Sequence, residues 1–225
     1  TKVIEILEKV GVGSSAEEIA AASLRLWNGC RDGDVEVVGR ELAGCADINW
    51  AHSGYYDRTA LMIAAINDKV DAVKALLGAE PALDQTDNEG RTALWHAVCN
   101  SRLVALGLLI NAKADVNKAP SAGGCEGQTA LWYAAANNNV EALKALIDAK
   151  ANLNEAPSTG SCEGRTALWQ ASSNGQANVV QLLVDNKADL NLAPKYGYSA
   201  RAVAYQNNRV EVIAILKKAG AKVGA

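Results

Sequence analysis

The sequence predicts an all-α solenoid of stacked helix–turn–helix units joined by β-turn or hairpin fingers. Three observations predict this class: a short motif recurs at nearly constant spacing, two helical patterns follow each copy, and a turn residue precedes it. A period of roughly 20–50 residues indicates a repeat architecture, because each unit buries its apolar face only against its neighbours.

The recurring motif is Thr-Ala-Leu, which begins at Thr59, Thr92, Thr129 and Thr166, with a degraded copy, Ser-Ala-Arg, at Ser199. Successive copies are therefore 33, 37, 37 and 33 residues apart. A hydroxyl before a helix accepts a hydrogen bond from a free backbone N–H, so the motif predicts a helix N-cap.

Each motif opens a short alanine-rich helix, and a second helix with one apolar stripe follows. In one copy the stripe is Val140, Leu143, Leu146 and Ile147, a spacing that places the side chains on one helical face. Left-handed backbone is expected in the turns around the helices, where Gly, Asn and Asp are favoured. The expected positions are Asp57, Gly90, Gly127, Gly164 and Gly197 before the motifs, and Asp68, Ser101, Asn138, Gly175 and Asn208 between the helices.

The motif spacing also sets the expected segment boundaries. They are an N-terminal helix and cap at 1–19, a divergent first repeat at 20–58, a repeat at 59–91, repeats with extended fingers at 92–128 and 129–165, a repeat at 166–198 and a C-terminal capping repeat at 199–225. Residues 2–10 have an amphipathic helix pattern. Ser15 and Glu18 form a capping box that predicts a helix through about Asn28, with a second helix at about 34–43.

These motifs resemble the ankyrin-repeat family, whose repeat of about 33 residues has a β-turn, two helices and a Thr-Pro-Leu-His signature. The matching strings are Thr-Ala-Leu-Trp-x-Ala at 92–97, 129–134 and 166–171, and Ala-Asp-Val-Asn or close variants at 46–49, 114–117, 151–154 and 188–191. The resemblance covers residues 20–225 approximately. The chain departs from the family by Ala for the signature Pro, Trp for the signature His, and four extra residues in the fingers at 121–128 and 158–165.

Composition excludes several classes of protein. The net charge of −3 with mixed signs gives no basic field, so nucleic acid is not an expected partner. No apolar run approaches the roughly 18–20 residues of a membrane span, so no membrane insertion is expected. Five scattered cysteines predict reduced thiols in an intracellular compartment, the cytoplasm, or an organelle if a targeting segment was removed.

The sequence shows no convergent set of groups that catalysis would need. The two histidines, His52 and His96, have no context that suggests a nucleophile, and phosphate-loop and metal-ligand spacings are absent. Cys125 and Cys162 hold equivalent places in adjacent fingers, which fits two incidental thiols or, as an alternative, a redox or metal pair. We therefore predict a chain that is not an enzyme and has no cofactor.

The resemblance implies a protein–protein interaction module or scaffold whose partner contacts the finger tips and the exposed ends of the first helices. Tyr and Arg are frequent among interface hot spots, so the tyrosines at the two ends are the preferred anchors. The expected contact residues are Tyr55, Tyr56, Arg58, Asn88, Glu89, Arg91, Glu126, Gln128, Glu163, Arg165, Lys195, Tyr196 and Tyr198. The expected helix positions are Ile66, Asn67, Cys99, Asn100, Ala136, Asn137, Ser173, Asn174, Gln206 and Asn207.

Several interpretations stay open at this level. The chain could be a monomeric adaptor, a fixed structural subunit of a large assembly, or a regulatory inhibitor of an enzyme or transcription factor. The Glu–Arg and Glu–Gln pairs of the fingers could be local charge pairs or contacts for a partner. The row Trp95, Trp132 and Trp169 could pack between repeats or line an apolar groove. Asn117, Asn154 and Asn191 could stabilise turns or be hydroxylated.

Overall fold

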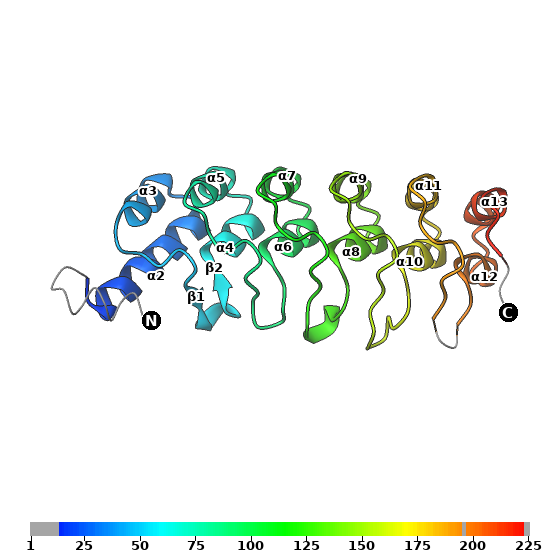
Figure 1. Ribbon diagram of the computed structural model, residues 1–225, viewed down its shortest axis with the longest axis horizontal. Coiled ribbons are helices and arrows are strands. Elements are labelled where there is room, and N and C mark those ends of the chain that lie inside the picture. The colour runs from blue at the N-terminus through cyan, green and yellow to red at the C-terminus, as the bar shows by residue number, and fades with distance from the viewer. Residues whose placement is uncertain (1–13, 195–196, 223–225) are drawn as a thin grey trace.

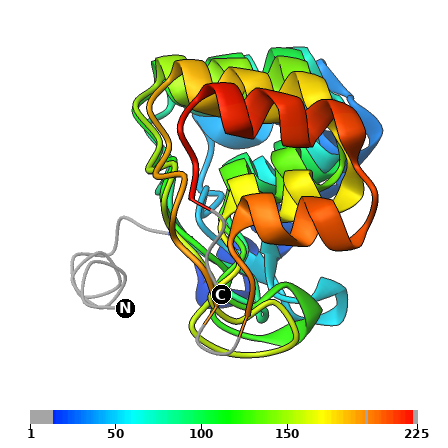
Figure 2. The same ribbon diagram turned by 90° about the vertical axis from the view of Figure 1, so that its right-hand side faces the viewer.

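The computed structural model describes residues 14–194 and 197–222, in which two parallel layers of helices run along a straight row of units (Figure 1). The first layer contains α2 (Ala16–Asp32), α4 (Ala60–Ile66), α6 (Ala93–Cys99), α8 (Ala130–Ala136), α10 (Ala167–Asn174) and α12 (Ala200–Gln206). The second contains α3 (Val35–Ala43), α5 (Val70–Gly78), α7 (Leu103–Asn111), α9 (Val140–Asp148), α11 (Ala177–Asp185) and α13 (Val210–Lys218). Viewed end-on, the fingers extend away from both layers (Figure 2).

The hydroxyls of the repeated motif cap the first helix of each unit, as the sequence predicts. Thr92 Oγ1 accepts a hydrogen bond from the Trp95 backbone N–H at 3.1 Å, and Ser199 Oγ accepts one from Ala202 at 3.3 Å. The same bond forms at Thr59, Thr129 and Thr166. Each hydroxyl satisfies one of the N–H groups that a helix N-terminus leaves free.

Left-handed backbone occupies the turn between the two helices of each complete unit. All five expected residues have positive φ, including the less favourable Ser101 at 55°. Of the turn positions before the motifs, Asp57, Gly90, Gly127 and Gly164 are confirmed, and Tyr56 joins them at 61°. The chain therefore reverses at the points that the sequence marks with small or polar residues.

The first helix, α2, is longer than predicted. Ser15 and Glu18 form the expected capping box, but the helix continues past Asn28 to Asp32 and ends at Gly33, which has φ 82°. The predicted end at about Asn28 was too early, because Gly29 keeps helical backbone and is buried, whereas Gly33 has the positive φ that ends the helix. The amphipathic pattern at 2–10 lies outside the described residues.

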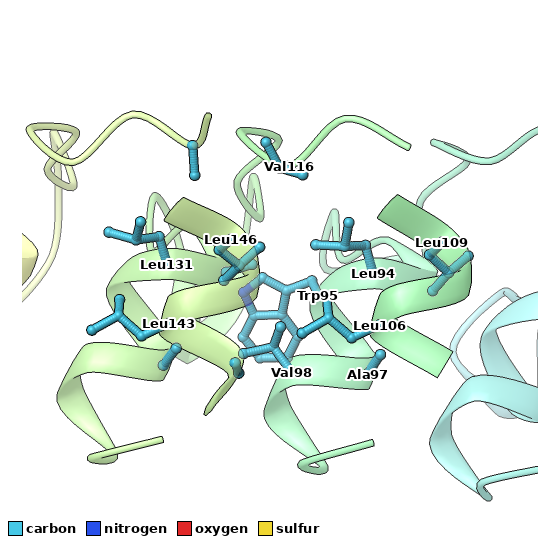
Figure 3. Packing of buried hydrophobic residues seen from close by; sticks show 14 of the residues in the cluster. Leu94, Trp95, Ala97, Val98, Leu106, Leu109, Val116, Leu131, Leu143 and Leu146 are labelled. Carbon is cyan, nitrogen blue, oxygen red and sulfur yellow. The ribbon is translucent and has the colours of Figure 1, made fainter. Parts of the chain in front are cut away.

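The core is a continuous row of leucines, alanines and tryptophans between the two layers. Leu94, Leu106 and Leu109 are almost fully buried, and Figure 3 shows Leu94 and Leu106 beside the indole of Trp95. Alanines on the first helices, such as Ala97 and Ala134, have no exposed surface. Small side chains at these positions let successive helices approach closely, so each unit buries the face of the next.

A row of side-chain oxygens joins each unit to the following one after the second helix. Asn154 Oδ1 accepts a hydrogen bond from the Asp189 backbone N–H at 2.8 Å. The same arrangement recurs from Asn49 to Ala82, Asp84 to Asp115, Asn117 to Asn152 and Asn191 to Lys222. The turn-stabilising role expected for Asn117, Asn154 and Asn191 is thus present, and it also connects neighbouring repeats.

Candidate protein-interaction surface

The finger tips form one edge of the molecule, which we call the finger edge: residues 53–58, 88–91, 121–128, 158–165 and 197–198. In the first finger, β1 (Ala51–His52) pairs antiparallel with β2 (Arg58–Thr59), and η1 (Ser53–Tyr55) forms its tip. The Asn88 N–H donates to the Tyr56 carbonyl at 2.9 Å, and the Ser121 N–H donates to the Glu89 carbonyl at 3.2 Å. The first three fingers are therefore joined through their backbones.

The two extended fingers have the same internal closure. The Gly127 N–H donates to the Pro120 carbonyl at 2.8 Å, and the Gly164 N–H donates to the Pro157 carbonyl at 2.7 Å. In the first of them η2 (Gly123–Cys125) forms a short turn. The four extra residues of each finger thus form a closed loop instead of an open extension.

The tyrosines that the sequence singles out remain exposed at both ends of the finger edge. Tyr55 is 43% exposed, Tyr56 54% and Tyr198 46%. Tyr55 also packs edge-on against His52 and lies 4.9 Å from the ring of Trp27, so part of it belongs to the first finger's own packing. Lys195 and Tyr196 lie outside the described residues.

Three of the expected contact residues have side chains that the fold uses internally: Gln128, Arg91 and Arg58. Gln128 is 9% exposed, and the side chain of Arg91 is 13% exposed because it pairs with Asp87 at 2.9 Å and with Glu89 at 2.8 Å. Arg58 also approaches Asp87, at 3.9 Å, and lies over the Tyr56 ring. These residues shape the finger edge more than they face a partner.

Asp87 organises the second finger from inside. Its fully buried carboxylate accepts hydrogen bonds from the backbone N–H groups of Glu89 and Arg91 and lies 2.9 Å from His96 Nε2. Burial opposes the charge on Asp87, but bonds from His96 and Arg91 outweigh it and hold its pKa well below the usual range. Burial lowers the pKa of His96, although Asp87 opposes that shift.

The Glu–Arg and Glu–Gln repeats of the fingers differ from one another. Glu89 pairs with Arg91, as the local interpretation expects. Gln128 instead donates from Nε2 to the Gly124 carbonyl at 3.4 Å. Among the described ion pairs none joins Glu163 to Arg165, so these two side chains differ from the pair two fingers earlier.

The tryptophan row packs between repeats, which removes the alternative of an open apolar groove. Trp95, Trp132 and Trp169 are buried, and each indole N–H donates to the backbone carbonyl that precedes the next motif. The bonds run from Trp27 to Arg58, Trp95 to Gln128, Trp132 to Arg165 and Trp169 to Tyr198, at 2.9, 2.9, 2.6 and 2.6 Å. Trp27 belongs to the same row although it was not predicted there, and its Leu-Trp dipeptide, shared with the later motifs, was a usable signal.

The asparagines at the ends of the first helices have a mixed role. Asn67, Asn174 and Asn207 donate from Nδ2 to carbonyl groups of the preceding unit. Asn100 and Asn137 instead donate to carbonyls one turn earlier in their own helices. All five side chains therefore have a structural partner at the end of the first helix.

The last two described fingers enclose a pocket of about 260 Å³. Three of its wall residues, Glu163, Arg165 and Tyr198, are among the contact residues expected from sequence. The remaining lining is Gly160, Ser161, Trp169, Pro194 and Gly197. The Arg165 guanidinium carbon lies 4.7 Å from the centre of the Trp169 ring. An open pocket with an arginine, a carboxylate and two aromatic rings suits a side chain of another protein.

Groups for other chemistry do not gather in the part of the chain that the structure describes. No three His, Cys, Asp or Glu side chains of residues 14–194 and 197–222 are placed to hold a metal ion. The five cysteines are free thiols, and burial raises the pKa of Cys30 to about 12. Within the same ranges no helix combines the length and apolar character that a bilayer crossing requires.

Comparison with solved structures gives the same fold. An ankyrin repeat domain from Acinetobacter baumannii AYE is 27% identical with a TM-score of 0.78, over 88% of this chain and 98% of that one. A chain from the complex of the predatory endopeptidase Bd0816 of Bdellovibrio bacteriovorus with immunity protein Bd3460 is 29% identical with a TM-score of 0.72, over 86% and 97%. The human ASB11 ankyrin repeat domain, at 17% identity and a TM-score of 0.70 over 89% and 85%, shares the fold.

No curated protein is similar enough in sequence to match this chain. The family described as ankyrin repeats in three copies matches residues 26–120, 82–157, 108–193 and 150–225. These overlapping matches run from residue 26, within α2, to residue 225 and include all five fingers. The chain belongs to the ankyrin-repeat family.

Proposed function

We propose that this chain is an intracellular protein-binding module that holds one partner protein along the finger edge and the adjoining ends of the first helices. Ankyrin repeats are generally protein–protein interaction modules. The observation that carries the proposal is the exposure of Tyr56 and Tyr198 at opposite ends of an edge that is otherwise internally bonded. Rigid backbone with exposed aromatic side chains binds at low entropic cost.

The side chains available to a partner form a specific subset of the finger edge. Tyr56, Asn88, Glu126, Glu163 and Tyr198 are exposed. Arg91 and Gln128 are not in this subset, because their side chains contact other residues of their own fingers. The aromatic residues would anchor the partner, and the carboxylates between them would select its charge, because rim charges mainly set specificity and association rate.

The test replaces the two exposed tyrosines that do not pack in the core, as Tyr56→Asn and Tyr198→Ser. Asn tolerates the positive φ of 61° at position 56, and the Tyr198 carbonyl that Trp169 uses stays in place. We expect the double variant to retain at least ~tenfold less partner in a pull-down from source lysate, since interface tyrosines often contribute 2 kcal/mol or more. Unchanged retention at unchanged helicity would contradict the proposal.

The matched control is Val210→Ser, which changes a side chain that is 77% exposed at the start of α13, away from the fingers. It should leave retention unchanged. The same pull-down addresses the alternative of a fixed assembly subunit. A stoichiometric set of partners that survives high salt would favour the subunit, because permanent interfaces are larger and more apolar than transient ones.

A second candidate function is inhibition of an enzyme by covering its surface. It is favoured by the similarity to a chain from the complex of endopeptidase Bd0816 with immunity protein Bd3460, where this chain covers 97% of that one. At 29% identity most side chains differ between the two chains, so we expect a different target. Stoichiometric loss of activity when this chain is added to an endopeptidase from its own source would favour this candidate over a passive adaptor.

A further inference from the structure

The charged and aromatic residues that line the pocket at the C-terminal end of the finger edge indicate which kind of side chain it binds. We propose that the pocket bounded by the finger at 158–165 and by Pro194, Gly197 and Tyr198 receives an acidic side chain, Asp or Glu, of the protein partner, with Arg165 as its counter-ion. This inference rests on the proposed protein-binding function and deepens it by naming the partner's chemistry at one position.

The pocket exists because two adjacent fingers have different lengths. Pro157 is nine residues before its motif residue Thr166, whereas Pro194 is five residues before Ser199. The preceding pair of fingers is equal in length, and there Pro157 packs so closely under Gly127 that a Cβ at Gly127 would lie 2.9 Å from it. The extended finger at 158–165 has no neighbour of its own length on its other side, and a pocket remains.

Arg165 is the finger arginine whose charge the described residues leave unpaired. Arg91 pairs with Asp87 and Glu89, and Arg58 lies 3.9 Å from Asp87. Arg165 occupies the same place before its motif, but no carboxylate of the described residues lies within ion-pair distance of it. The difference follows from sequence, because the residue equivalent to Asp87 in this finger is Ser161 or Cys162, neither of which is acidic.

The surroundings of Arg165 favour a carboxylate over other guests. Its guanidinium carbon lies 4.7 Å from the centre of the Trp169 ring, and Tyr198, whose carbonyl accepts the Trp169 indole hydrogen bond, also lines the pocket. A guanidinium placed over an aromatic ring keeps its planar fork of donors free for two parallel hydrogen bonds to a carboxylate. Arg165 is half-buried, which reduces competition from water, so the pair is stronger than on an open surface.

Glu163 is the one acidic residue among the lining residues, and its charge weakens the binding of a carboxylate in the pocket. It is exposed, so water screens it more strongly than the half-buried Arg165. A partner with a basic side chain would use Glu163 instead and be repelled by Arg165. The two charged residues therefore give opposite predictions for an acidic and a basic guest.

The experiment is an NMR titration of the full 15N-labelled chain with three blocked amino acids: N-acetyl-glutamate amide, N-acetyl-glutamine amide and N-acetyl-lysine amide. The reporters are the indole N–H of Trp169 and the backbone amides of Ser161 and Tyr198. We expect saturable shifts with the glutamate probe at millimolar concentration. Arg165→Gln should weaken this binding about tenfold, because it removes the charge from the hydrogen bonds to the carboxylate, and Glu163→Gln should strengthen it about threefold by removing a repulsion.

The charge control is Lys217→Gln, which removes one positive charge from the exposed last turn of α13 and should change nothing. Saturation by the lysine probe with loss in Glu163→Gln would overturn the proposal, and so would the absence of saturable shifts with all three probes. The spectrum of each variant reports whether it is folded. If Arg165→Gln retains the partner fully while the tyrosine variant loses it, this inference fails and the protein-binding function stands.

Discussion

Asp87 is a buried carboxylate in a short loop, and at the residue scale it shows how one side chain can organise a finger. Its oxygens form hydrogen bonds with two backbone N–H groups, an arginine side chain and a histidine ring. Removing a charge from water is costly, and these bonds offset the cost only as a complete set. Asp87 therefore holds the loop shape that presents Asn88 and Glu89 on the finger edge.

His96 makes this arrangement sensitive to acid. The folded pKa of His96 is lowered from 6.5 by burial, so the unfolded chain binds a proton more readily than the folded chain. This contribution to stability is complete above pH 6.5 and is lost as the pH falls below it. The lowered pKa of Asp87 acts in the same direction below 3.8. Arg58 and Arg91, the other charges facing His96, also favour its neutral form.

We therefore expect the denaturation midpoint in urea to fall between pH 7 and pH 5 in the wild type and to stay nearly level in His96→Gln. Gln keeps an N–H donor for Asp87 without a titrating ring, and Gln170 already occupies the equivalent position two repeats later, in the motif at 166–171. Urea titrations followed by circular dichroism at several pH values measure this. An equal slope in both proteins would show that His96 does not carry the pH dependence.

Sequence predicts the position of a residue along the finger better than it predicts whether its side chain is buried. Repeat spacing correctly locates Arg91 and Gln128 at the finger edge, but it contains no information on whether Asp87 or Gly124 will engage their side chains. Asp87 and His96 form their contact only in this one finger, so the repeat pattern could not reveal it. Motif spacing predicts which residues occupy equivalent positions in successive repeats. Contacts particular to one repeat, such as that between Asp87 and His96, depend on residues that the other repeats lack.

At the scale of the elements, the fold depends on bonds between successive units as much as on the helices themselves. Helices of seven to nine residues, such as α4 and α5, are too short to be stable alone in water. The asparagine oxygens that accept from the next unit's backbone fix the distance and angle between repeats. The prediction of the short helices from their motifs succeeded because each motif contains its own cap, turn and apolar stripe.

Asn154→Ala tests this connection. It leaves the Asp189 N–H without its acceptor, so we expect the free energy of unfolding to fall by about 1–2 kcal/mol. Asn154→Asp is the matched control, because Asp84 makes the same bond to the next unit and a carboxylate is an acceptor too. Denaturant unfolding measures both variants. Equal losses for Ala and Asp would show that the bond to Asp189 contributes little.

On the scale of the whole molecule, a solenoid is stabilised unit by unit through nearest neighbours. A central unit such as α8 and α9 has a packed unit on both sides, whereas α12 and α13 have one on a single side (Figure 1). Polar contacts in the last unit partly replace the packing that a second neighbouring unit would provide. Arg201 replaces the core leucine of the motif and donates from Nη1 to the Ala221 carbonyl at 2.8 Å, and Ser199 donates to the Lys222 carbonyl.

These contacts replace apolar burial with hydrogen bonds at a partly exposed end, and such bonds contribute about 1 kcal/mol each. Burial of a leucine contributes about 1.5–3 kcal/mol, so the last unit should open more readily than the centre. We expect amide hydrogens of α12 and α13 to exchange at least ~tenfold faster than those of α6 to α9, measured by mass spectrometry on the intact folded chain. Uniform protection would instead mean that the chain opens only as a whole. In that case the pocket beside Tyr198 would be as rigid as the centre, and not adjustable to its guest.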